Sequence, residues 1–190
     1  PLDDNPEAKI QHYAGIASGR SQPKSGLLCP AAMGGKNWDP MSYHPERATL
    51  YIPVIESCGV ITSTVVPDDE KPEPREWFTG GGIQQPQRIT GSLTAVNVKT
   101  GKVTHKAESE WPLLGGVLAT AGDLVFAGLP NGDLVAYDAE NLNELRRFPT
   151  GSGINAPVMS YAIGEKQYIA ISVGFGGTSP TWRDDANPGL

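Results

Sequence analysis

The sequence predicts an all-β fold, and three observations support this prediction. Short apolar segments rich in β-branched and aromatic residues recur at spacings of about 8–12 residues, with turn residues between them. The chain holds 23 Gly and 17 Pro among 190 residues, a loop-rich composition that argues against a helical bundle. Segments in its second half also repeat a common frame. Strands at this spacing form a sandwich, a barrel or a propeller.

The first half of the chain divides by composition. Residues 1–27 are polar with scattered Gly and Pro, and we expect an irregular lead-in. Residues 28–66 contain both cysteines and the strand-like run 48–57, ATLYIPVIES. Residues 67–88 are charged and rich in Pro and Gly, which predicts a long loop of the kind that is functional or mobile.

The second half alternates short apolar strands with turn signals over residues 89–177, and residues 178–190 form a polar tail. The run LVFAG is followed by PNGD and LVAYD, a hairpin in which we expect Asn131 and Gly132 to take positive φ. The runs PVMSYAI and YIAISVG predict a further hairpin.

An internal repeat favours a propeller over the other all-β folds. GSLTAVNVKTGKVTH, from Gly91, and GDLVAYDAENLNELR, from Gly132, share the frame G-x-L-x-A-x-(N/D), a turn and a further strand. A period near 40 with four strands per unit is typical of propeller blades, and these two copies are spaced accordingly. Two copies do not exclude a hairpin-rich sandwich.

Composition and charge exclude several functions. The net charge of −6 and the isoelectric point near 5.0 argue against nucleic-acid binding. No apolar run approaches the roughly 18 residues of a membrane span. The sequence starts at Pro1 without an initiator Met, so we expect a processed product or a segment of a longer polypeptide. Two cysteines are too few for a structural zinc site and form either free thiols or one disulfide.

Three stretches of the chain resemble a known family. CPAAMGGKNWDPMSYHP from Cys29, GGVLATAGDLVFAGLPNGDLVAYDAE from Gly115 and SGINAPVMSYAIGEKQYIAISVGFGG from Ser152 are similar to the C-terminal part of the quinoprotein methanol and ethanol dehydrogenases. These enzymes use pyrroloquinoline quinone (PQQ). The resemblance implies an eight-bladed β-propeller with PQQ on its axis, of which this chain would supply the last blades and the closing segment of an incomplete ring.

The resemblance suggests four cofactor-binding residues. The glycine-flanked turn GGKNWDP places Asn37, whose amide is both donor and acceptor, where the family has an asparagine in hydrogen-bond reach of the quinone. Without the family, Asn37 would be read as a turn cap beside a core Trp38. Leu114 and Phe175 stand where family members have tryptophan near the cofactor pocket, and these two departures leave the substrate open.

The resemblance also bears on four structural positions. It predicts a disulfide between Cys29 and Cys58, at places that match a disulfide of methanol dehydrogenases, and a disulfide implies the periplasm. His105 and Arg146 fall where the blade motif often has a docking Trp, which predicts weaker packing between blades at those sites.

The catalytic base and the ligands of a Ca²⁺ or lanthanide ion are expected outside this chain. No stretch here matches the family's catalytic motifs, and the chain contains no C-x-x-C-H haem-attachment motif. The acidic residues of the Pro-rich loop and the tail are interpreted as solvated groups. These are Asp68, Asp69, Glu70, Glu73, Glu76, Asp184 and Asp185.

The function expected from the resemblance is part of a periplasmic PQQ-dependent alcohol dehydrogenase. In that family the ion polarises a PQQ carbonyl, an aspartate takes the alcohol proton, hydride passes to PQQ, and electrons go to a cytochrome c. The partners expected are the remainder of the propeller polypeptide, a cytochrome c and a small alcohol. The alternatives are a non-catalytic β-propeller module for binding or assembly, or a relative of the PQQ-dependent sugar dehydrogenases.

Overall fold

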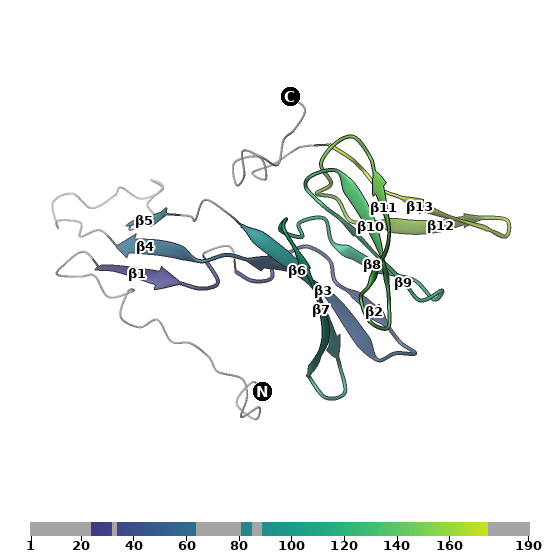
Figure 1. Ribbon diagram of the computed structural model, residues 1–190, viewed down its shortest axis with the longest axis horizontal. Coiled ribbons are helices and arrows are strands. Elements are labelled where there is room, and N and C mark those ends of the chain that lie inside the picture. Colours follow the sequence, from purple (N-terminus) through teal and green to yellow (C-terminus); the bar gives the residue numbers. More distant parts are fainter. Residues whose placement is uncertain (1–23, 32–33, 64–80, 85–88, 175–190) are drawn as a thin grey trace, which may run out of the picture. The chain divides into compact units, whose positions relative to one another are not determined.

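The computed structural model describes residues 24–31, 34–63, 81–84 and 89–174. These residues form thirteen β-strands and no helix (Figure 1). They fall into two compact units, one containing residues 24–31, 58–63 and 81–84, the other residues 34–57 and 89–174. Nowhere in these ranges is there a helical segment with the length and hydrophobicity that a membrane crossing would need.

The smaller unit is a three-stranded antiparallel sheet in the order β1-β4-β5, formed by Lys24–Leu28, Gly59–Ser63 and Gly81–Gln84. Leu28 pairs with Gly59, so the next residues, Cys29 and Cys58, face each other at the end of the ladder. They are joined by a disulfide, with their Cα atoms 4.4 Å apart. The structure confirms this expected pairing.

Two strands of this unit lie where the sequence predicted irregular chain. β1 begins inside the predicted lead-in, and β5 lies inside the predicted 67–88 loop. The reason is tertiary pairing, since both strands add to the edges of β4 and neither carries a strong local strand signal. Gly81 lies against the backbone of Thr62 and Ser63, where a Cβ atom would clash.

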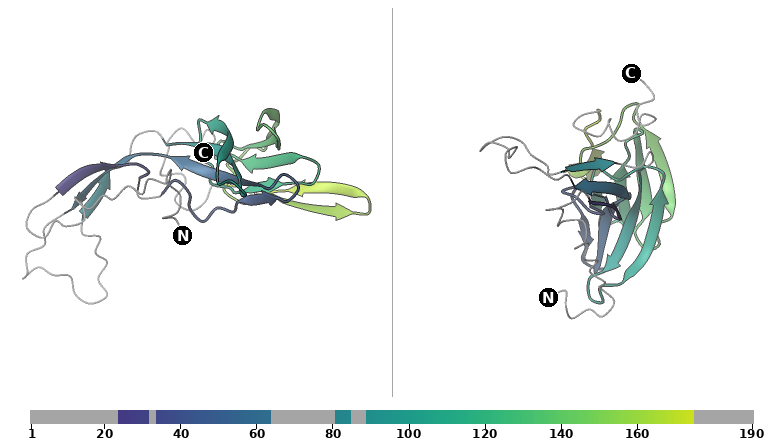
Figure 2. Two further views of the ribbon diagram at one scale, coloured as in Figure 1. Left: turned by 90° about the horizontal axis from the view of Figure 1, so that it is seen from below. Right: turned by 90° about the vertical axis from the view of Figure 1, so that its left-hand side faces the viewer.

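The larger unit contains two four-stranded antiparallel sheets and a hairpin. The first sheet has the order β2-β3-β6-β7, formed by Ser42–His44, Thr49–Glu56, Thr90–Asn97 and Val103–Ser109. The second has the order β8-β9-β10-β11, formed by Val117–Ala119, Leu124–Gly128, Asp133–Asp138 and Glu144–Pro149. The hairpin pairs β12, Met159–Ile163, with β13, Lys166–Ala170, and projects from this unit in yellow in Figure 2.

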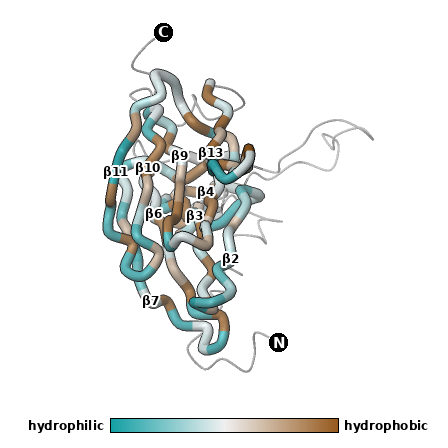
Figure 3. The backbone as a smooth tube through the Cα atoms, turned by 90° about the vertical axis from the view of Figure 1, so that its right-hand side faces the viewer, coloured by the Kyte–Doolittle hydropathy of each residue, from teal (hydrophilic) through white to brown (hydrophobic). Residues whose placement is uncertain are grey.

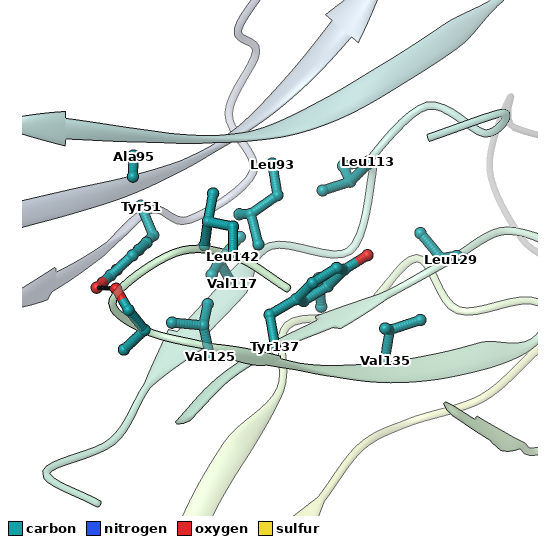
Figure 4. Close-up of a cluster of buried hydrophobic side chains, with 12 residues drawn as sticks. Tyr51, Leu93, Ala95, Leu113, Val117, Val125, Leu129, Val135, Tyr137 and Leu142 are labelled. Carbon is teal, nitrogen blue, oxygen red and sulfur yellow. Dashed lines mark hydrogen bonds between the residues drawn. The ribbon is translucent and has the colours of Figure 1, made fainter. Parts of the chain in front are cut away.

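Side chains buried between the two four-stranded sheets form the main core (Figure 4). Tyr51 and Leu93 contribute from the first sheet, and Val125, Val135 and Tyr137 from the second. β3 alternates buried and half-buried residues, the pattern of a strand with one face against the core. Hydropathy follows this arrangement, with β9 apolar and β11 largely polar in Figure 3. The two sheets therefore pack face to face.

The Tyr51 side chain also links the two sheets by a hydrogen bond. It is fully buried, and its hydroxyl donates to the carbonyl oxygen of Ala139 at 2.5 Å. A buried hydroxyl without a partner costs about 1–3 kcal/mol, so this contact lets a polar group sit within the core.

The predicted sequence repeat is present as structure. In β6 and in β10 the repeat ends in the same turn: the Asn97 carboxamide accepts two backbone N–H groups, and the Asp138 carboxylate accepts two at the equivalent positions. Gly101 has φ 68° in the first turn, and Leu142, at the equivalent position of the second, has φ 60°. The structure thus contains two copies of one blade unit.

The PNGD turn differs from the expected one in detail. Of its residues only Gly132 has a positive φ, 94°, whereas Asn131 was expected to have one as well. Pro130 fixes a negative φ at the first turn position, so a β-turn closes from the N–H of Gly132 to the carbonyl of Leu129. A Cβ atom on Gly132 would also lie 2.8 Å from the carbonyl oxygen of Ser152.

The two positions expected to lack a docking Trp lie on exposed strands. His105 is exposed on β7 and Arg146 on β11, where the Arg146 guanidinium lies 5.4 Å from the ring centre of Phe148. The strength of packing between the sheets at these positions stays a prediction.

Candidate functional site

Three loops of the larger unit lie in contact, and each leads into the first strand of a sheet or hairpin. We name these ranges, 34–41 before β2, 111–116 before β8 and 152–158 before β12, the leading loops. The N–H of Val117 donates to the carbonyl of Pro40 at 3.0 Å. A Cβ atom on Gly115 would lie 3.0 Å from the carbonyl oxygen of Ala156. The second loop therefore touches the other two.

Glycine makes this close approach possible. Gly116 has φ 77°, and a Cβ atom there would lie 2.8 Å from Cδ of Pro40. A residue with a side chain at 115 or 116 would push its neighbours away, because its Cβ atom would lie closer to them than ordinary van der Waals contact allows.

The first leading loop is held by hydrogen bonds that its backbone carbonyl oxygens accept. The Lys36 ammonium donates to the carbonyl oxygens of Asn37 and Asp39, and the N–H of Ile55 donates to the carbonyl of Gly35 at 2.8 Å. Asp39 is buried, and burial raises the pKa of its carboxyl group, while its own backbone N–H and the Lys36 charge act in the opposite direction. The loop is thus fixed on both sides of Asn37.

Asn37 and Trp38 lie on the outside of this fixed loop. The Asn37 side-chain oxygen accepts the N–H of Trp38 at 2.9 Å, and Trp38 is 79% exposed. Within the described residues, the NH₂ group of Asn37 donates to no acceptor. The alternative of a turn cap beside a core Trp38 is therefore wrong for Trp38, which is exposed, although the Asn37 oxygen does accept the backbone N–H that follows it.

The other two predicted cofactor residues differ in placement. Leu114 is 6% exposed and packs with Ile55 and Ile89 in a small apolar cluster. Phe175 falls outside the described residues. The contact of all four residues with PQQ stays a prediction.

Asn155 is a polar residue that the sequence reasoning missed. Its amide nitrogen and oxygen are both buried and have no hydrogen-bond partner in the described structure. The repeat contained the signal, because Asn155 lies one full repeat after Leu114 and so occupies an apolar position of the blade unit.

A groove of about 430 Å³ lies elsewhere in the larger unit, between β7 and the β10–β11 hairpin. Its charged groups are already paired. The Lys106 ammonium lies 2.9 Å from Glu56 and 3.0 Å from Glu108, and Arg147 lies 2.6 Å from Glu144. Because these charges neutralise one another, the groove offers no concentrated charge to a ligand.

The described residues contain no group of three or more His, Cys, Asp or Glu side chains able to hold a metal ion. The acidic residues of the predicted 67–88 loop and of the tail lie outside the described ranges. The part of the chain that the structure describes therefore presents the Asn37 amide and the exposed Trp38 ring on one loop, and it contains no such cluster of metal ligands.

Stacked four-stranded antiparallel sheets built from one repeated unit define part of a β-propeller. No family model matches the chain. The quinoprotein ethanol dehydrogenase of Pseudomonas aeruginosa is 34% identical over 170 residues, 88% of this chain and 27% of that protein. The 1-butanol dehydrogenase (quinone) of Thauera butanivorans is 33% identical, over 86% of this chain and 27% of that protein.

Solved structures agree with these sequence matches. The quinohemoprotein alcohol dehydrogenase of Comamonas testosteroni superposes with a TM-score of 0.73 and 29% identity, over 89% of this chain and 26% of that one. A europium-containing methanol dehydrogenase, at 23% identity and a TM-score of 0.69, shows the same fold. The chain belongs to the quinoprotein alcohol dehydrogenase family, and it spans about a quarter of the length of the relatives it matches.

Proposed function

We propose that this chain forms part of a periplasmic PQQ-dependent alcohol dehydrogenase that oxidises a small alcohol to an aldehyde and passes electrons to a cytochrome c. The observation that carries the proposal is the Asn37 amide, exposed on a backbone-fixed loop with its NH₂ donors unused within the described residues. Homologues named quinoprotein alcohol dehydrogenases support the cofactor and the reaction class.

The residues present fit such a cofactor. PQQ, when bound, supplies the quinone that accepts hydride from the alcohol. Asn37 would donate a hydrogen bond to a quinone oxygen, where a fixed donor stabilises developing negative charge. Trp38 would offer its exposed ring to the cofactor plane. Leu114 and Phe175 are the other two residues that we propose for the cofactor pocket, and Leu114, which is 6% exposed, would reach the cofactor only through the small part of its side chain that the apolar cluster leaves uncovered.

The remaining parts of the reaction are assigned to polypeptide outside this chain. We place the ligands of the Ca²⁺ or lanthanide ion and the catalytic base in the rest of a propeller, because no stretch of this sequence resembles the family's catalytic motifs. The chain alone is therefore expected to be inactive. A dye-linked alcohol oxidation assay on the isolated chain with PQQ and metal checks this, and turnover there would overturn the assignment.

The cofactor role of Asn37 is tested by PQQ binding. The near-UV absorbance of bound PQQ is followed in a titration of the wild-type protein, Asn37→Ala and the control Asn141→Ala, which alters another exposed asparagine. We expect about tenfold weaker binding for Asn37→Ala, which corresponds to the loss of one neutral hydrogen bond of about 1.4 kcal/mol, and no change for the control. Equal affinity of all three proteins would remove Asn37 from the site.

A further inference from the structure

The groove between β7 and the β10–β11 hairpin lies between the last strands of the two four-stranded sheets. Ala107 of β7 pairs with Leu93, which belongs to the main core, so Ala107 faces the second sheet. Ser109 faces the same way, because alternate residues of a strand share a face. These two short side chains line a space of about 430 Å³, a volume typical of sites for small molecules.

The opposite wall carries two long side chains that bind each other instead of filling the groove. Glu144 of β11 pairs with Tyr137 of β10, so both residues lie on the face toward the first sheet. The Arg147 guanidinium donates to Glu144 from Nε at 3.0 Å and from Nη2 at 2.6 Å, and to Asp133 from Nη1 at 2.9 Å. Each nitrogen atom of this guanidinium therefore already donates a hydrogen bond.

The hydroxyl group of Tyr137 distinguishes this groove from an ordinary gap between sheets. Tyr137 is 6% exposed and lines the groove, and its hydroxyl group makes no hydrogen bond in the part of the chain that the structure describes. In Figure 4 this hydroxyl group points toward the side of the core where Leu129, another residue of the groove, lies. Burial raises the pKa of Tyr137 to about 12, so the group stays protonated and can donate. A buried hydroxyl group without a partner is unfavourable, which indicates a ligand that accepts its hydrogen bond.

The rest of the groove combines apolar and amide groups. Leu129 and Leu142 are buried in the main core and Trp111 packs against it, so these residues give the groove an apolar part. Asn141 and Asn143 also line the groove, and both are exposed. Carboxamides donate and accept hydrogen bonds. A ring with C–H groups on its faces and hydroxyl groups at its edge matches such a surface.

The charges of the groove favour a neutral ligand. Two basic and three acidic residues line it: Lys106, Arg147, Glu108, Glu110 and Glu144. Lys106 lies 2.9 Å from Glu56 and 3.0 Å from Glu108, and Arg147 is bound as described above. An anionic ligand would have to compete with these carboxylates for the two basic groups, and a cationic ligand with the basic groups for the carboxylates.

We propose that this groove binds a neutral polyhydroxy compound of about the size of a monosaccharide, with a ligand hydroxyl group accepting a hydrogen bond from Tyr137. A C–H face of the ligand packs against Trp111, and its other hydroxyl groups bind Asn141 and Asn143. This site includes neither Asn37 nor Trp38, so the inference is independent of the proposed function.

The test measures binding of methyl α-D-glucopyranoside to the full chain by isothermal titration and saturation-transfer NMR, without PQQ. Tyr137→Phe removes the hydroxyl group and keeps the buried ring, and Tyr161→Phe is the matched control, because Tyr161 lies outside the groove. Ala107→Leu adds a larger side chain to the groove. Glucuronate and glucosamine are compared as an anionic and a cationic ring of similar size. Circular dichroism first establishes that each variant folds.

We expect the glucoside to bind equally to the wild type and Tyr161→Phe, and about fivefold more weakly to Tyr137→Phe, which loses one neutral hydrogen bond. Binding to folded Ala107→Leu should be abolished, and both charged sugars should bind the wild type more weakly than the glucoside. Four results would overturn the proposal: no binding to the wild type, equal affinity for Tyr137→Phe, undiminished binding to Ala107→Leu, or tighter binding of either charged sugar. Because no cofactor takes part, failure here is distinct from failure of PQQ binding.

Discussion

Leu142 is a buried leucine in a backbone conformation that favours glycine. We therefore predict that its glycine variant is more stable than its alanine variant. Its φ is 60°, and its side chain is 4% exposed in the main core. The equivalent Gly101 has φ 68°, and nothing lies within 4 Å of the place its Cβ atom would take. The two sites therefore separate backbone strain from burial.

The magnitudes follow from these two sites. Leu142→Ala removes buried side chain at unchanged strain, and we expect a loss of about 3 kcal/mol. Leu142→Gly removes the same side chain and also relieves a left-handed strain of about 1–2 kcal/mol, so its loss is expected to be about 1 kcal/mol smaller. Gly101→Ala adds strain alone and is expected to cost about 1 kcal/mol.

Urea unfolding followed by circular dichroism gives the free energy of unfolding of each variant. In ordinary strand or helix conformations glycine is less stable than alanine by about 0.5–1 kcal/mol. If Leu142→Gly proves less stable than Leu142→Ala, residue 142 does not adopt the left-handed conformation, and the equivalence of the two turns is wrong. Gly101→Ala serves as the control, because it changes φ strain without any packing contact.

Three further predictions concern single buried or paired groups. Asn155→Leu should raise the free energy of unfolding by about 1 kcal/mol, because it removes a buried amide that has no partner among the described residues, and a decrease would mean that the amide has a partner such as water. The hydrogen bond from the Lys106 ammonium lowers the pKa of Glu56 from its ordinary value of 4.5. The Glu56 carboxylate therefore stabilises the fold above pH 4.5, and this stabilisation is lost as the pH falls through the lower pKa of the folded state. Glu56→Gln should therefore flatten the acid limb of stability against pH, and an unchanged limb would show that the pair contributes nothing. Replacing Cys29 and Cys58 by serine should lower the free energy of unfolding by about 3–4 kcal/mol relative to the disulfide-bonded wild type, for a sequence separation of 29 residues. Denaturation measures this loss, and the reduced wild type is the control that should match the variant.

The sequence could predict the repeated blade unit because its signals are local. Asn97 and Asp138 each cap a turn through hydrogen bonds within three residues, and the apolar alternation of the strands is visible without any tertiary contact. The disulfide was predicted by resemblance, since the residues alone left free thiols open. The register of β1 on β4 then explains why the two cysteines meet.

Features that depend on distant contacts escaped prediction. β5 is a glycine-rich segment that becomes a strand only because β4 offers it an edge. Leu142 stands where the first repeat has a glycine, and the core contact that holds it there comes from another sheet. Among the candidate site residues, no local pattern distinguishes Leu114, which packs inward, from Trp38, which is exposed.

The leading loops explain how one repeated blade can carry different chemistry at each copy. The stacked sheets set the spacing of the loops, and Gly115 and Gly116 bring their backbones into contact. Backbone contact of this kind depends on residues with little or no side chain, so the remaining positions of each loop can change without moving the sheets. Asn37 and Asn155 illustrate the two results of such freedom: the first is an exposed amide with donors to offer, and the second is a buried amide with no partner among the described residues. A polar residue in these loops can therefore contribute to a site only where its loop turns outward, which is the physical reason to look for the cofactor contact at Asn37.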